Sequence, residues 1–164
     1  MEELLRQHRD AEAMLVKLAA GVERVQREGV RGGGVLDDLR ELRHAIQGEI
    51  LSHFREEEQA LFPVLGRHID SASGPIAMMM EEHAIFRQLE LQFEEAVAAL
   101  EADFRDGWEE KVCEAAASIA RLLPPHIEKE ESILFPMAED LLGADEWDQV
   151  RQLWREALAA ALPA

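Results

Sequence analysis

Two stretches of the sequence pair a histidine with a glutamate four residues later, followed by a second glutamate and a Leu-Phe-Pro tripeptide. HFREEEQALFP begins at His53 and contains Glu57, and HIEKEESILFP begins at His126 and contains Glu130. The two copies share six of their eleven positions. Four residues of a helix advance by about 40° and about 6 Å, so each pair lies on one face. An imidazole and a carboxylate placed in this way can bind one metal ion.

A single His-x-x-x-Glu pair is weak evidence for a metal site. The same spacing is typical of a surface pair that stabilises a helix by only a few tenths of a kcal/mol. Here both pairs interrupt an apolar stripe with helical spacing, which indicates that they face a core. The first stripe continues through Ile46, Ile50, Ala60 and Val64, and the second through Val112, Ala116, Ile119, Leu123, Ile133 and Met137.

Two further histidines occupy core positions of the same kind. His8 stands where the stripe that includes Leu4 and Ala11 requires an inward residue, and His83 belongs to a stripe that runs from residue 76 to 104. The motif histidines are 73 residues apart, and these two are 75 apart. The chain therefore contains two histidine-bearing helical hairpins in tandem, and an approximate twofold axis would bring all four imidazoles together.

Burying four histidines and two glutamates without partners would cost several kcal/mol, so the centre must supply something that satisfies them. Two metal ions bridged by Glu57 and Glu130 would do so. Nitrogen and oxygen ligands without thiolates favour iron or manganese, and zinc also binds imidazole well. The alternative is a hydrogen-bonded core network without metal, which must explain six polar groups at one level.

The elements that position these residues are predicted to be helices. Helix-breaking residues cluster at 29–34, 70–75, 106–107 and 143. Between them lie four segments of about 28 to 35 residues and a shorter tail, without β alternation. These lengths and short connections predict an all-α fold, an antiparallel four-helix bundle with an additional C-terminal helix.

Prolines inside the predicted helices carry separate expectations. Pro63 and Pro136 each follow a Leu-Phe pair and are expected to kink or end the helix there. The adjacent pair at 124–125 is expected to break the fourth helix and restart it, with His126 in the first turn.

The predicted domain organisation places the bundle at residues 1–142 and an amphipathic helix at 143–164. One face of this tail carries Trp147, Val150, Trp154, Leu158 and Ala161. The favoured interpretation is a helix packed on the bundle, and the alternative is a surface for a homodimer or a protein partner.

Composition limits the classes of partner. The 164 residues carry a formal net charge of −17, which disfavours nucleic acid and anionic membrane surfaces. No run of about 18 apolar residues occurs, and the acidic start at Met1–Glu3 does not resemble a signal peptide. The single cysteine, Cys113, suits a reducing compartment, and we expect a cytoplasmic protein.

The two HxxxEExxLFP copies, with a QHR helix before them and an EEH helix between them, resemble the hemerythrin-like (HHE cation-binding) family over about residues 1–142. The resemblance implies a four-helix bundle around a non-haem di-iron centre. By motif match, His8 and His53 serve one iron, His83 and His126 serve the other, and Glu57 and Glu130 bridge them.

One residue departs from the family pattern. Oxygen-carrying members have a further histidine one turn before the residue that matches His83, and here that position is Met79. A thioether is a poor ligand for this type of iron, so the second iron would have an open position. Glu90, two turns after His83, is expected to hydrogen-bond in the core or reach a channel, with direct ligation as an alternative.

Other glutamates of the motifs are given no ligand role. Glu56, Glu58 and Glu131 are expected to point away from the stripe into solvent, and a supporting role for Glu58 or Glu131 stays open.

The leading functional hypothesis is a di-iron protein that binds or senses O2, NO or reactive oxygen species at an open iron position, with no catalytic residue nominated. The first alternative is a di-iron enzyme or iron donor, for peroxide or NO reduction or iron-sulfur cluster repair. The second alternative is a structural bundle in which the metal acts only as a staple. The hypothesis of a ligand-binding protein is favoured over that of an enzyme.

Overall fold

The structure, a computed structural model, describes residues 1–31, 33–102 and 107–161, without the side chain of Ala161. Every regular element in this described part is helical, which confirms the prediction of an all-α protein. None of the described helices is long and apolar enough to cross a membrane.

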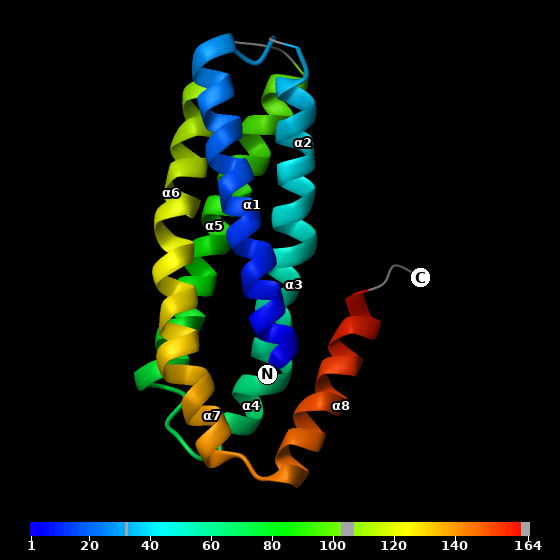
Figure 1. Ribbon diagram of the computed structural model, residues 1–164, viewed down its shortest axis with the longest axis vertical. Helices are drawn as coiled ribbons and strands as arrows, with labels where there is room; N and C mark the ends of the chain where they lie inside the picture. Colours follow the sequence, from blue (N-terminus) through cyan, green and yellow to red (C-terminus); the bar gives the residue numbers. More distant parts are fainter. Residues whose placement is uncertain (32, 103–106, 162–164) are drawn as a thin grey trace.

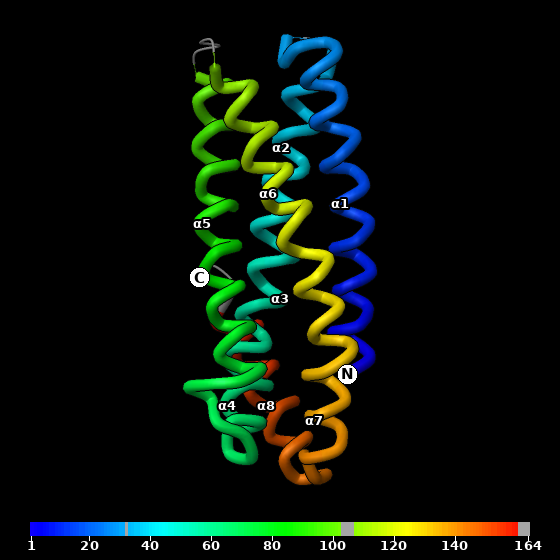
Figure 2. Tube along the Cα trace, turned by 90° about the vertical axis from the view of Figure 1, so that its left-hand side faces the viewer, coloured from blue at the N-terminus to red at the C-terminus, as the bar shows by residue number. Residues whose placement is uncertain are grey.

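Four long helical segments lie side by side, and each runs opposite to the one before it (Figure 1, Figure 2). The first segment is α1 (Glu2–Glu28), and the third is α5 (Gly74–Ala102). The second consists of α2 (Val35–Ala45), η1 (Ile46–Ile50), α3 (Leu51–Glu56), η2 (Glu57–Leu61) and α4 (Phe62–Leu65), where η marks a π-helical stretch. The fourth consists of α6 (Trp108–Lys129), η3 (Glu130–Leu134) and α7 (Phe135–Leu141). A shorter helix, α8 (Ala144–Ala161), follows.

The apolar core is divided into two clusters. The major cluster lies toward the 28–35 connection and includes Leu18, Leu39, Phe93, Leu100 and Ile119. The minor cluster includes Leu4, Leu65, Met79, Leu134 and Phe135. His8 and His83 fall between members of the two clusters, and Glu57 and Glu130 do so in the other two segments. His53 and His126 each directly precede the last major-cluster residue of their segment, and a polar layer separates the clusters.

Two widened π turns begin at the nominated bridging residues. The amide N–H of Phe62 donates to the carbonyl of Glu57, and that of Phe135 donates to the carbonyl of Glu130, five residues back in both cases. Pro63 and Pro136 then occupy the first turn of the next α-helical stretch, where a missing N–H has little cost. The helical path therefore continues where the sequence predicted a kink or an end.

The π turn in the fourth segment also moves the buried face by one residue. Leu134 and Ala138 are buried, whereas Ile133 is 49% exposed and Met137 is half-buried. The prediction that Ile133 and Met137 face the core was wrong, because it assumed an uninterrupted α-helical period.

The expected break at residues 124–125 was also wrong. α6 runs from Trp108 to Lys129 with both prolines inside it, and His126 lies near its end. Both prolines are on the exposed face. Carbonyl groups that lose their usual donors there can hydrogen-bond to water, which makes the prolines tolerable.

The C-terminal helix folds back against the second segment. α8 packs on η2, α3 and α4, and it buries Val150 and Ala157 while Leu158 stays 44% exposed. The imidazole of His68 contacts the Glu146 carboxylate at 2.7 Å, and Arg67 donates to Gln149 at 2.8 Å. α8 is therefore attached beside the π turn that begins at Glu57.

Truncation of a ring in the major cluster tests this description of the core. Phe93→Ala should lower the free energy of unfolding by about 3–5 kcal/mol, because the side chain is 1% exposed. Leu91→Ala is the matched control on the same helix; it is 47% exposed and should cost less than about 1 kcal/mol. Urea unfolding followed by circular dichroism measures both losses, and equal losses would contradict the assignment.

Candidate metal centre

The structure brings all six nominated side chains together in the polar layer. They come from each of the four long segments, and none is more than 5% exposed. Their ligand atoms form two overlapping groups, each within 4.8 Å: His8, His53, Glu57 and Glu130; and Glu57, His83, His126 and Glu130. The two glutamates belong to both groups.

Glu130 faces all four imidazoles. Its Oε2 lies 3.1 Å from Nε2 of His8 and 3.9 Å from Nε2 of His53. Its Oε1 lies 3.2 Å from Nε2 of His126 and 3.9 Å from Nε2 of His83. One carboxylate oxygen is thus turned toward each histidine pair, which is the arrangement that a bridging carboxylate needs.

Glu57 lies between the two pairs from the opposite segment. Its Oε2 is 3.6 Å from Nε2 of His53 and 3.5 Å from Nε2 of His83. The two motif carboxylates therefore share the centre unequally: Glu57 approaches one imidazole of each pair, and Glu130 faces all four.

Each imidazole is held from behind through its Nδ1 atom. The acceptors are Glu131 for His8 at 2.9 Å, Gln7 for His53 at 2.8 Å, Glu58 for His83 at 2.8 Å and Glu82 for His126 at 2.9 Å. An acceptor at Nδ1 keeps the proton there and leaves the Nε2 lone pair directed into the polar layer, where it can bind a cation.

Aromatic rings close the sides of the layer. Phe54 stacks on His83 with ring centroids 3.8 Å apart, and Phe135 stacks on His8 at 5.3 Å. Phe62 also lies against His83, at 5.8 Å. These rings exclude water from the polar atoms and fix the imidazole planes.

The polar atoms at the centre fit bound cations. Six buried side-chain atoms have no hydrogen-bond partner in the described part of the chain: both carboxylate oxygens of Glu57 and of Glu130, and Nε2 of His83 and His126. Nε2 of His8 and Nε2 of His53 face each other at 3.1 Å. With both Nδ1 atoms protonated these are two lone pairs in contact, a repulsion that a cation between them removes.

Without bound metal, the pKa values of the Glu57 and Glu130 carboxyls lie far from their ordinary values. Burial raises the pKa of the Glu57 carboxyl well above its ordinary value, and the Glu130 charge raises it further. Burial acts in the same direction on Glu130, but the surrounding imidazoles outweigh it and hold the Glu130 pKa well below the ordinary value. Without metal, the pKa values of the two carboxyls are therefore displaced in opposite directions.

Comparison with known proteins agrees with this geometry. The family model for the hemerythrin HHE cation-binding domain matches residues 1–138. The chain belongs to the hemerythrin HHE family.

Among curated relatives, an iron-sulfur cluster repair protein YtfE from Yersinia pseudotuberculosis serotype IB is 36% identical over 136 residues. A YtfE from Yersinia pestis strain Pestoides F is 35% identical over the same length. Both alignments cover 80% of this chain and 59% of the relative, so the chain spans about three fifths of those proteins. No solved structure gives a significant match.

The cofactor of this hemerythrin HHE chain is a non-haem di-iron centre. Family membership and the two overlapping His and Glu groups both support it. Imidazole and carboxylate ligands without thiolates are the donor set expected for such a centre.

Several nearby residues had other expected roles. The prediction that Glu56 is solvated was wrong: it is 3% exposed and accepts from Gln7 at 2.8 Å. Glu58 and Glu131 do support histidines, although Glu131 is 44% exposed. Glu90 is outside both ligand groups and accepts from Gln47 at 3.0 Å.

Sequence reasoning missed Gln7 and Glu82 as imidazole acceptors. Each directly precedes a core histidine, and the two are 75 residues apart, as are His8 and His83. The repeat spacing was a usable signal that residues beside the histidines also correspond. Met79, the departure from the family pattern, is 2% exposed in the minor cluster.

The perturbed Glu57 carboxyl predicts how metal-free stability depends on pH. A folded-state pKa above the unfolded value, about 4.3, means that stability falls as pH rises from there toward the raised pKa. With chelator present, wild type should therefore lose about 1 kcal/mol or more between pH 5 and 8 relative to Glu57→Gln, which carries no proton to lose. Urea unfolding at both pH values measures the difference.

The exposed Glu49, on the same segment, supplies the control as Glu49→Gln. It should show the wild-type pH dependence. If Glu57→Gln showed it too, the raised pKa would be contradicted.

Proposed function

We propose that this chain is an iron donor in the repair of iron-sulfur clusters. The observation that carries the proposal is the buried group of six ligand-type side chains, in which six inward polar atoms have no hydrogen-bond partner in the described protein. The relation to proteins named for iron-sulfur cluster repair adds support. This was an alternative at the level of sequence, behind the binding of O2 or NO.

The proposed ligands are those nominated from the motifs. We assign one iron to His8 and His53, the other to His83 and His126, and both bridges to Glu57 and Glu130. The proposed hemerythrin-like unit covers residues 1–142, and the helix within 143–164 is an addition to it; residues 162–164 lie outside the described part.

The donor set suits transfer of iron to a cluster. When bound, the centre supplies ferrous ions held by nitrogen and oxygen atoms. Sulfide and thiolate ligands in an acceptor bind such ions in preference to imidazole and carboxylate, so transfer is favourable. The chain's own residues contribute by keeping the Nε2 lone pairs inward and by excluding water through Phe54 and Phe135 until an acceptor is present.

A second candidate function is the binding of O2 or NO, and Met79 favours it. A buried thioether at this position leaves an iron coordination position without a protein ligand. A change in the visible spectrum of the ferrous protein on addition of O2 or NO would support this function, and an unchanged spectrum would exclude it.

Metal analysis tests the ligand assignment. Anaerobically purified wild-type protein should contain two iron ions per chain. His53→Ala and His126→Ala should each bring iron below one per chain, because each removes an inward imidazole, whereas the exposed His44→Ala should not change it. Far-ultraviolet circular dichroism separates iron loss from unfolding. Full iron content in a folded His53→Ala protein would contradict the assignment.

Cluster reconstitution tests the donor role. Ferrous wild-type protein, mixed anaerobically with sulfide and an iron-sulfur protein stripped of its cluster, should restore the acceptor's cluster absorbance. The reaction contains enough chelator to capture free iron, so free ferrous iron at the same concentration should restore little. His126→Ala should also restore little, because it carries less iron. No reconstitution by iron-loaded wild type would contradict the proposal.

A further inference from the structure

The two halves of the centre differ in what supports the imidazole acceptors. By the repeat spacing, Gln7 corresponds to Glu82 and Glu56 corresponds to Lys129. In one half, Glu82 accepts from His126 and pairs with Lys129. In the other half, the acceptor is an uncharged amide, and its support is a buried carboxylate.

This carboxylate joins the centre to the C-terminal helix. Glu56 accepts from the Gln7 side-chain amide at 2.8 Å and from the Ser52 hydroxyl at 3.4 Å. Trp154, on α8, lies near the same carboxylate and offsets part of the rise in the Glu56 pKa that burial causes. Two hydrogen bonds therefore link Glu56 through Gln7 to His53, and α8, which packs on α3, brings Trp154 to the outer end of this series.

The orientation of the Gln7 side-chain amide decides how this series acts on His53. The Gln7 side chain has a donor end and an acceptor end, and Glu56, as an acceptor, holds the donor end. The acceptor end is then turned to Nδ1 of His53, which places the imidazole proton there and frees Nε2. A flipped amide would present N–H groups to Nδ1 and favour the opposite tautomer, whose Nε2–H cannot bind metal. Glu82 offers an oxygen in either orientation and needs no such control.

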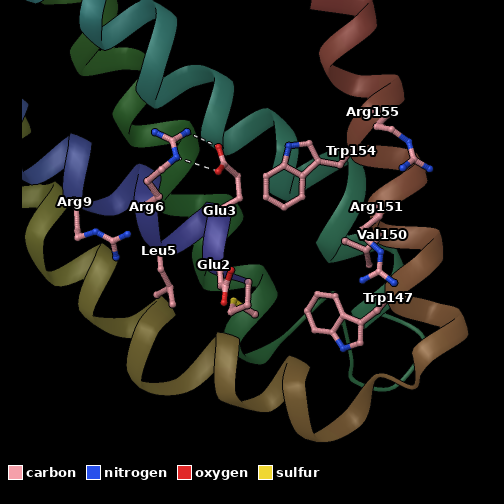
Figure 3. A pocket seen from close by; sticks show the side chains of 11 residues that line it. Glu2, Glu3, Leu5, Arg6, Arg9, Trp147, Val150, Arg151, Trp154 and Arg155 are labelled. Atoms are coloured by element: carbon pink, nitrogen blue, oxygen red, sulfur yellow. Dashed lines mark hydrogen bonds and ion pairs between the residues drawn. The ribbon is translucent and has the colours of Figure 1, made fainter.

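The outer end of the series lies at the surface. Trp154 lines a groove of about 930 Å³ between α8 and the first turns of α1, together with Trp147, Leu5 and Arg6. Figure 3 shows both indoles directed from α8 into this groove, opposite the Arg6–Glu3 pair. Movement of α8 at this surface would therefore act first on Trp154.

We propose that Trp154 and Glu56 are positioning residues that couple α8 to one metal position only, the one at His8 and His53. In the other half, the imidazoles of His83 and His126 are held by Glu58 and Glu82. The partners of these carboxylates, Arg87 and Lys129, lie outside α8. This inference requires the di-iron centre, but it does not depend on a role in cluster repair.

Release of ferrous iron to a chromogenic chelator, measured anaerobically by stopped flow, tests the coupling. Glu56→Met, which keeps the side-chain length but cannot accept, should release one of the two iron equivalents about tenfold faster and leave the other unchanged. Lys129→Met at the equivalent position is the matched control and should accelerate neither equivalent, because Glu82 presents an oxygen to His126 in either orientation. The His53 tautomer, measured in the same Glu56→Met variant, assigns the accelerated equivalent to the position at His8 and His53.

Trp154→Phe keeps an aromatic ring but removes the donor, and it should accelerate the same equivalent as Glu56→Met by about threefold. Trp147→Phe is the matched control in the same groove and should have no effect. The double variant Glu56→Met/Trp154→Phe should release iron no faster than Glu56→Met alone, since both changes break one series.

A second readout does not depend on bound metal. Long-range proton–nitrogen NMR of the metal-free protein should show Nε2 of His53 unprotonated in wild type and partly protonated in Glu56→Met. Acceleration of both equivalents together, equal effects of Trp154→Phe and Trp147→Phe, or an unchanged His53 tautomer in Glu56→Met would each overturn the proposal.

Discussion

A carboxylate loses several kcal/mol of hydration when it is buried, and Glu57 and Glu130 are both fully buried beside one another. Four imidazole lone pairs face the same space. In the metal-free protein a proton can satisfy only part of this group, which is why the Glu57 and Glu130 pKa values move in opposite directions. Two divalent cations satisfy all of it at once. The polar layer is therefore a feature of the fold that only its cofactor makes favourable.

The rest of the bundle is arranged around this requirement. Apolar clusters lie on both sides of the polar layer, so the long segments remain packed together even though their centre is polar. Two of the three π turns in the described chain start at Glu57 and Glu130, the two residues that must reach both histidine pairs. Widened turns are frequent at functional sites, because one extra residue re-aims the side chains that follow without ending the helix.

The convergence of the six nominated residues could be predicted from sequence because they interrupt apolar stripes, and a helical period is visible in any one segment. The repeat spacing extended that local signal across the fold. The buried face after Glu130 could not be predicted in the same way, since a π turn leaves no mark in composition and shifts Ile133 outward. The predicted helix break at residues 124–125 was wrong for a related reason. The free-energy cost of a proline inside a helix depends on whether the carbonyls that it leaves unpaired face water.

Glu56 shows the limit of periodicity most clearly. Its position in the helix correctly excluded it from the ligand groups, but exposure does not follow from that, because α8 covers the same face. A tertiary contact from a helix about a hundred residues later in the chain decides the burial of Glu56 and the residues it supports. The tandem repeat preserves what a metal demands of each half, an inward Nε2 on every imidazole. The repeat does not require that both halves meet this demand by the same means. In one half, Gln7 and Glu56 orient the imidazole of His53, and these residues lie beside the C-terminal helix.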